Sequence, residues 1–112
     1  MNTADITAEV FVESMLRHVP FDGWSEAAMQ VTAEELGMSA SDVDVLFPSG
    51  VNGVIETGLK DIDNRMVDIF MARFDAEIAT MPVHVKVREL LLARFELLQP
   101  HKAAVRKLLA FM

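Results

Sequence analysis

Apolar residues recur every three or four positions along this 112-residue chain, which is the period of one face of an α-helix, and strict alternation is rare. This pattern predicts six helices: residues 3–18, Ser25 to Gly37, Ser39 to Phe47, and residues 51–78, 83–98 and 101–112. The sequence therefore predicts an all-α fold without strands.

Residues that favour helix ends mark several of these boundaries. Ser25 and Ser39 are expected N-caps, and Asp42 follows Ser39 by three residues, near the positive end of its helix. Gly37 is expected to end the second helix, and the segment from Pro20 to Gly23 separates the first two. The predicted inward stripes are Ala8, Phe11, Met15, Val19; Trp24, Ala27, Ala28, Val31; Ile55, Leu59, Ile62, Met66, Ile69, Phe70; Val87, Leu90, Leu91, Phe95, Leu98; and Val105, Leu108, Leu109, Met112.

Composition narrows the class of protein. Apolar residues make up 52% of the chain, which is long enough for one domain with its own core. No apolar run approaches the roughly 18 residues of a transmembrane helix, and the N-terminus lacks the features of a secretory signal. Without cysteine, disulfides and thiolate chemistry are excluded. We expect a cytoplasmic protein.

Charge is distributed unevenly along the chain, whose formal net charge is −7. Residues 1–50 contain a single base, Arg17, against nine acids, which gives −8, whereas residues 51–112 carry +1. No lysine or arginine occurs between Arg17 and Lys60. The N-terminal half is therefore poorly suited to a phosphate backbone.

No motif in the chain predicts catalysis or a cofactor. Asp61 and Asp63 have the spacing of the first two ligands of a calcium loop, but Met66 and Ala72 replace its essential Gly and Glu. The three histidines lack the spacing of metal ligands, and no nucleophile–base pair can be assembled. We expect a non-enzymatic protein with no metal and no cofactor.

The chain ends in the apolar segment "RKLLAFM", with no polar residue to cap the last helix. Either a partner covers this face or the sequence is the front part of a longer protein. We favour the second explanation.

Several segments resemble known families. Three short helices followed by a long one, together with "ELGMSASDVDVLFPSG", resemble the N-terminal region of TetR regulators. More specifically, "HVPFDGWSEAAM", "LGMSASDVDVLFPSGV" and "VRELLLARFELLQPHKAAVRKLLA" together resemble the N-terminal half of the COQ9 family, over nearly all 112 residues. Residues 21–24 and 99–102 carry most of this resemblance.

The resemblance implies a TetR-like homodimer adapted to lipid handling. Its members are accessory proteins of ubiquinone biosynthesis that bind isoprenoid lipids or phospholipids and present quinone intermediates to a hydroxylase. It implies a degenerate, acidic helix-turn-helix-like unit over residues 1–50 and the start of a helical ligand and dimerisation domain over residues 51–112. It also implies peripheral contact with the inner membrane, through a region beyond Met112.

Five apolar residues are candidates for part of a lipid pocket wall, although ordinary core packing would explain the same stripes. They are Phe70, Phe74, Leu91, Phe95 and Leu98. Arg88 and Arg94 lie among them and would either meet a lipid head group or pair with acids.

The predicted recognition helix carries Asp42 and Asp44, where a DNA-binding protein would use cationic or amide side chains. A lipid-binding accessory protein is therefore the favoured hypothesis, and DNA is an unfavoured partner. A TetR-type transcriptional regulator is the alternative, and an acidic helical scaffold for another protein remains open.

Overall fold

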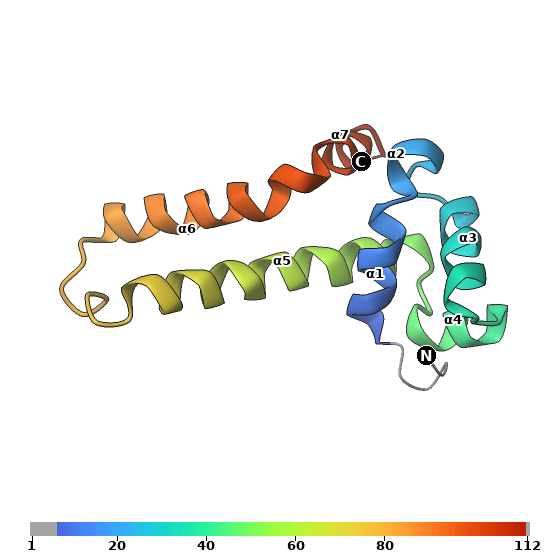
Figure 1. Ribbon diagram of the computed structural model, residues 1–112, viewed down its shortest axis with the longest axis horizontal. Helices are drawn as coiled ribbons and strands as arrows, with labels where there is room; N and C mark the ends of the chain where they lie inside the picture. Colours follow the sequence, from blue (N-terminus) through green and yellow to red (C-terminus); the bar gives the residue numbers. More distant parts are fainter. Residues whose placement is uncertain (1–6, 112) are drawn as a thin grey trace. The chain divides into compact units, whose positions relative to one another are not determined.

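A computed structural model describes residues 7–111, which are helical and contain no strand (Figure 1). The predicted all-α fold is confirmed. The elements are α1 (Ala8–Leu16), α2 (Val19–Asp22), α3 (Glu26–Leu36), α4 (Ala40–Leu46), α5 (Val51–Phe74), α6 (Val83–Leu98), the 3-10 turn η2 (Gln99–His101) and α7 (Lys102–Phe111).

The first predicted helix differs from α1 at its end. Residues 3–6 of that prediction, like Met112 of the last one, lie outside the described range. Thr7 caps α1 by accepting a hydrogen bond from the backbone N–H of Val10 (3.3 Å). The helix stops at Leu16, because Pro20 has no N–H to donate to the Leu16 carbonyl. Pro20 instead lies in the first turn of α2, a short helix that was not predicted.

The predicted boundaries of α3 and α4 are confirmed. Ser25 accepts a hydrogen bond from the N–H of Ala28 (3.2 Å), and Gly37 ends α3 in the left-handed conformation with φ of 70°. Ser39 and Asp42 form a capping box at the start of α4. Local side-chain chemistry is therefore sufficient to fix the turn between these two helices.

α5 is shorter than predicted, since it ends at Phe74 and residues 75–80 form turns. The Glu77 carbonyl accepts hydrogen bonds from both the N–H and the hydroxyl of Thr80 (3.1 and 3.3 Å). This local bonding competes with continuation of the helix. α6 then begins at Val83, directly after Pro82.

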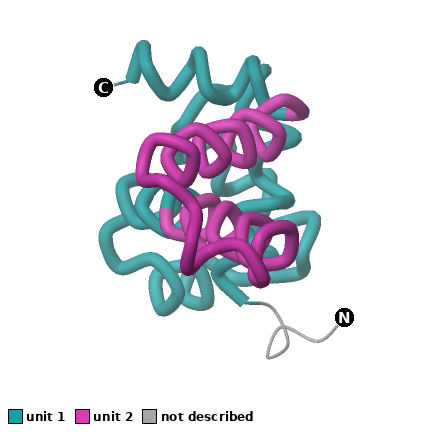
Figure 2. Tube along the Cα trace, turned by 90° about the vertical axis from the view of Figure 1, so that its left-hand side faces the viewer, with its two compact units in different colours: residues 1–59, 101–112 teal, residues 60–100 magenta. Residues whose placement is uncertain are grey.

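The chain forms two compact units (Figure 2). Unit 1 comprises Met1–Leu59 and His101–Met112, and unit 2 comprises Lys60–Pro100. These bounds differ from the predicted division at residue 50. Val54 on the first turn of α5 is fully buried in the core of unit 1, and the buried Trp24 indole donates to the carbonyl of Ala104 in α7 (3.0 Å).

The core of unit 1 follows the predicted stripe of the first helix most closely. Phe11, Met15 and Val19 are fully buried, and the rings of Phe11 and Phe47 lie 5.1 Å apart. In the second helix Ala27 is exposed, whereas Met29, Thr32 and Ala33 are buried. Thr32 can be buried because its hydroxyl donates to the Ala28 carbonyl (2.8 Å), so it faces the core without an unpaired group.

Only part of the apolar stripe predicted for the last helix is buried. Val105 and Leu108 are half-buried, Leu109 is exposed, and Ala104 is the buried residue of α7.

None of the helices within residues 7–111 combines the length and the apolarity needed to span a membrane.

Candidate functional site

Two ion pairs join α5 to α6 in unit 2, where the helices run antiparallel (Figure 1). Arg73 donates two hydrogen bonds to Glu96 (3.2 and 2.9 Å), and Arg94 donates one to Asp63 (3.0 Å). The hydrogen bond from Arg73 holds the pKa of Glu96 below its ordinary value. Of the two alternatives for Arg94, the structure therefore shows pairing with an acid.

These ion pairs identify the side of α6 that faces α5. Ala93 is only 1% exposed. Around the helix axis, Arg94 lies about 100° to one side of Ala93 and Glu96 about 60° to the other side. Successive residues of an α-helix are turned by about 100°, so Leu91, two residues before Ala93, points about 200° away. Leu91 lies on the side of α6 opposite to the seam with α5.

The five lipid-pocket candidates do not share one environment. Phe70 is buried and Phe74 half-buried, with their rings 5.4 Å apart on α5. Leu98 is half-buried. Leu91 and Phe95, in contrast, are 51% and 65% exposed. The structure brings together the two phenylalanines of α5 and places Leu91 and Phe95 on an open surface.

The open surface of α6 carries five large apolar side chains, which we call the α6 outer face, and the exposed His84 and Arg88 lie among them. The α6 outer face consists of Val83, Val87, Leu91, Leu92 and Phe95, all of which are exposed. The Arg88 side chain lies beside it, 3.5 Å from Glu89 and 63% exposed. A helix that is apolar on both its inner and outer sides is typical of one that is covered by a ligand or partner.

Unit 1 contains a groove of about 370 Å³ between α3 and α4. Its floor is apolar and consists of Met29, Ala33, Met38 and Val43. Its rim carries the exposed carboxylates of Glu26, Glu34 and Asp44. We call this feature the acidic groove.

The two aspartates of the predicted recognition helix have different roles. The carboxylate of Asp42 accepts a hydrogen bond from the N–H of Ser39 (2.9 Å) and so stabilises the start of α4. Asp44 is exposed at the acidic groove. One aspartate is therefore a structural cap and the other a surface charge.

The acidic groove was only partly foreseen from the sequence. Asp44 was predicted as an acid of the recognition helix, whereas Glu26 and Met38 were not singled out. The spacing of Glu26, Gln30 and Glu34 by four residues places all three on one face of α3, and this is the signal that could have identified the rim.

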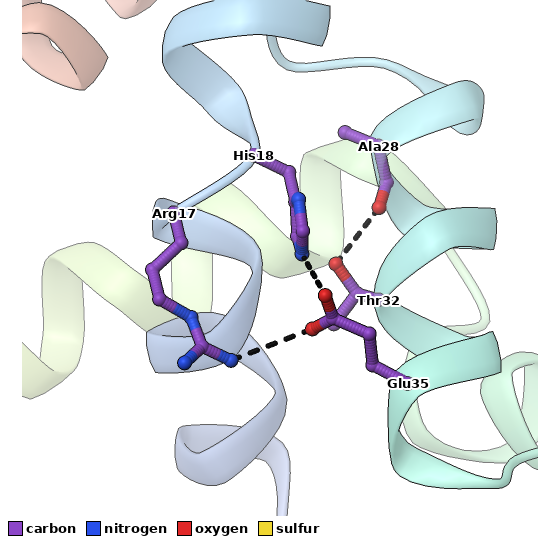
Figure 3. Close-up of polar contacts among 5 residues, drawn as sticks. All are labelled: Arg17, His18, Ala28, Thr32 and Glu35. Atoms are coloured by element: carbon purple, nitrogen blue, oxygen red, sulfur yellow. Dashed lines mark hydrogen bonds and ion pairs between the residues drawn. The ribbon is translucent and has the colours of Figure 1, made fainter.

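A second polar cluster of unit 1 links the end of α1 to α3 (Figure 3). The Glu35 carboxylate lies 2.9 Å from Nε2 of His18 and 3.4 Å from the Arg17 guanidinium. Hydrogen bonding to His18 lowers the pKa of Glu35, with a smaller contribution from the charge of Arg17. These contacts hold the end of α1 and α3 together.

Among residues 7–111, no group of three or more His, Asp or Glu side chains could hold a metal ion. The acids of the rejected calcium-loop pattern have other partners: Asp61 pairs with Arg65 at 3.0 Å, and Asp63 with Arg94.

No family model, no curated protein and no solved structure matches this chain. The two surfaces above, the α6 outer face and the acidic groove, therefore carry the functional argument.

Proposed function

We propose that this chain is a non-catalytic lipid-binding accessory protein of ubiquinone biosynthesis, with a TetR-like fold, that presents isoprenoid quinone intermediates to a hydroxylase. The resemblance of three sequence segments to the COQ9 family gives the proposal its biochemical content. The observation that carries it is the α6 outer face, where large apolar side chains are exposed opposite the buried Ala93.

The chemistry of the α6 outer face suits a hydrocarbon chain better than a polar ligand. Val87, Leu91 and Phe95 follow one another at four-residue intervals, so they form a continuous apolar strip along the helix. Covering such a strip removes apolar area from water at roughly 25 cal/mol per Å². Arg88, exposed beside the strip, offers a cation to an anionic head group.

Native mass spectrometry of the protein purified from cells, combined with lipid extraction, tests this proposal. We expect a co-purifying isoprenoid quinone or phospholipid. The double variant Leu91→Asp, Phe95→Asp should lose it, because two carboxylates in the strip would have to be desolvated on binding.

Val45→Asp is the control for one carboxylate at an exposed apolar position outside α6, since Val45 is 80% exposed on α4 in unit 1. It should retain the lipid. A wild-type protein that is empty, or a double variant that carries as much lipid as Val45→Asp, would contradict the proposal.

The alternative function is that of a TetR-type regulator. In its favour, α3 and α4 are joined by a short turn containing Gly37, as in helix-turn-helix proteins. Against it, residues 18–59 contain seven acids and no lysine or arginine. DNA bound to this region would release no counterions from its phosphates, because no cation is present to replace them. A gel-shift assay at low salt with a mixed-sequence duplex should show no complex; a salt-sensitive complex would favour the regulator.

A further inference from the structure

We propose that the acidic groove of unit 1 is a docking site for a basic amphipathic helix of a partner protein. One apolar side chain of that helix would insert between α3 and α4, and its lysines or arginines would meet the rim. The inference rests on unit 1 alone and is independent of the proposed lipid function.

The floor of the acidic groove is suited to an apolar anchor. Met29, Met38 and Val43 line it, and each has little exposed surface, so its side chain is already held in the core. Unbranched thioethers adapt to the shape of an incoming side chain at small cost. The volume of about 370 Å³ exceeds that of any single side chain, which leaves room for an anchor and its neighbours.

The rim of the acidic groove determines the charge of the partner. Glu26, Glu34 and Asp44 are exposed, and within residues 7–111 none of their carboxylates has an ion-pair or hydrogen-bond partner. No lysine or arginine occurs between Arg17 and Lys60 to neutralise them. Three unpaired carboxylates around an apolar floor are complementary to a helix that has cations on both sides of an apolar residue.

Other occupants fit less well. Nucleic acid would be repelled by the same carboxylates, and no group of acids among the described residues could hold a metal ion. A second copy of the chain could offer the exposed face of α7, with Lys102, Arg106 and Leu109. That contact would join two different faces and would propagate from copy to copy unless the rotation closed a ring.

Binding of a synthetic amphipathic peptide composed of leucine and lysine, with the period of an α-helix, tests the proposal. The protein carries ¹³C-methyl methionine, and its methyl NMR signals are followed during the titration. We expect the Met29 and Met38 signals to shift, whereas those of Met15, in the core of unit 1, and Met66, in unit 2, should not. Affinity should fall as salt is raised.

A triple variant neutralises the rim: Glu26→Gln, Glu34→Gln, Asp44→Asn. It should weaken binding about tenfold, since each exposed ion pair contributes a factor of roughly 1.4 to 5. The matched control removes the same charge from unit 2 through Asp68→Asn, Asp75→Asn, Glu77→Gln, three exposed acids. It should bind as the wild type does.

Three results would overturn the proposal. The first is equal affinity of the two triple variants. The second is equal binding of a peptide in which serine replaces leucine. Binding would then depend on charge alone, without an apolar side chain in the groove. The third is concentration-dependent association of the protein alone that the rim variant abolishes, which would make a second copy the occupant. If the rim variant does not fold by circular dichroism, Asp44→Asn alone replaces it.

Discussion

Single residues fix the turn between α3 and α4 through two mutually supporting hydrogen bonds. The Ser39 hydroxyl accepts from the N–H of Asp42 (3.2 Å), and the Asp42 carboxylate accepts from the N–H of Ser39 (2.9 Å). Both groups would otherwise be unpaired at a helix start. This pair was predictable because a capping box depends only on residues close together in sequence.

Replacing Ser39 by Ala should destabilise the protein by about 1 kcal/mol, because the cap is lost. The measurement is urea unfolding followed by far-ultraviolet circular dichroism. Ser41→Ala is the control: Ser41 is exposed inside the same helix, and its replacement should leave the free energy of unfolding within about 0.5 kcal/mol. Equal effects of the two variants would contradict a capping role.

The Arg17–His18–Glu35 cluster makes stability depend on pH in the acid range. Its partners lower the pKa of Glu35 below the ordinary value of 4.5, which applies in the unfolded chain. The stabilisation is therefore complete above pH 4.5 and is lost as pH falls through the lower, folded pKa.

Urea midpoints measured against pH for the wild type and Glu35→Gln should show this loss. The two proteins should differ at neutral pH and converge below pH 4.5. Glu34→Gln removes the neighbouring carboxylate, which has no ion pair among residues 7–111, and should change the midpoint little at either pH. A gap that stays constant as pH falls would show that titration of Glu35 contributes nothing.

At the scale of whole elements, α6 is a case in which the spacing of apolar residues does not predict which side of the helix is buried. The predicted stripe of Val87, Leu90, Leu91, Phe95 and Leu98 divides in the structure, because Leu90 and Leu98 are half-buried and the other three are exposed. A helix with apolar residues on every side has no unique inner face in its sequence. Which side of α6 faces α5 depends on Ala93 and on two ion pairs between the helices. The partners in these pairs are 23 and 31 positions apart in the sequence.

Because Ala93 occupies the inner side of α6, a larger side chain there should be poorly accommodated. Ala93→Leu should lower the free energy of unfolding by about 1 to 3 kcal/mol through overpacking. Ala72→Leu, at an exposed position of α5, is the matched control and should change it by less than about 0.5 kcal/mol. If both variants were equally stable, Ala93 would not lie in a packed seam.

At the scale of the whole molecule, the sequence predicted the fold class and most helix ends but not which segments associate. The predicted boundary at residue 50 rested on the resemblance to TetR-like proteins, which gives an order of helices along the chain and not the contacts between them. The observed units depend on buried contacts such as that between Trp24 and Ala104, which are 80 positions apart. Long-range contacts of this kind have no local signature, so the return of α7 to unit 1 did not follow from the pattern alone.

The hydrogen bond from the Trp24 indole attaches α7 to the rest of unit 1, and its loss should be measurable. Trp24→Phe keeps an aromatic ring but removes the donor, and it should cost about 1 kcal/mol of stability. Circular dichroism in urea is the appropriate probe, because Trp24 is the only tryptophan of the chain. Phe21→Leu, at a position that is 85% exposed, serves as the control and should be nearly neutral. An unchanged midpoint in Trp24→Phe would exclude this role.

The methionines of the acidic groove also expose it to chemical damage. Oxidants convert the thioether of methionine into a sulfoxide, which is polar and can be reduced back enzymatically. A sulfoxide at Met29 or Met38 would place a strongly hydrated oxygen in the apolar floor. Oxidation of these two methionines should therefore weaken docking while leaving the rim carboxylates intact, and reduction of the sulfoxides should restore it.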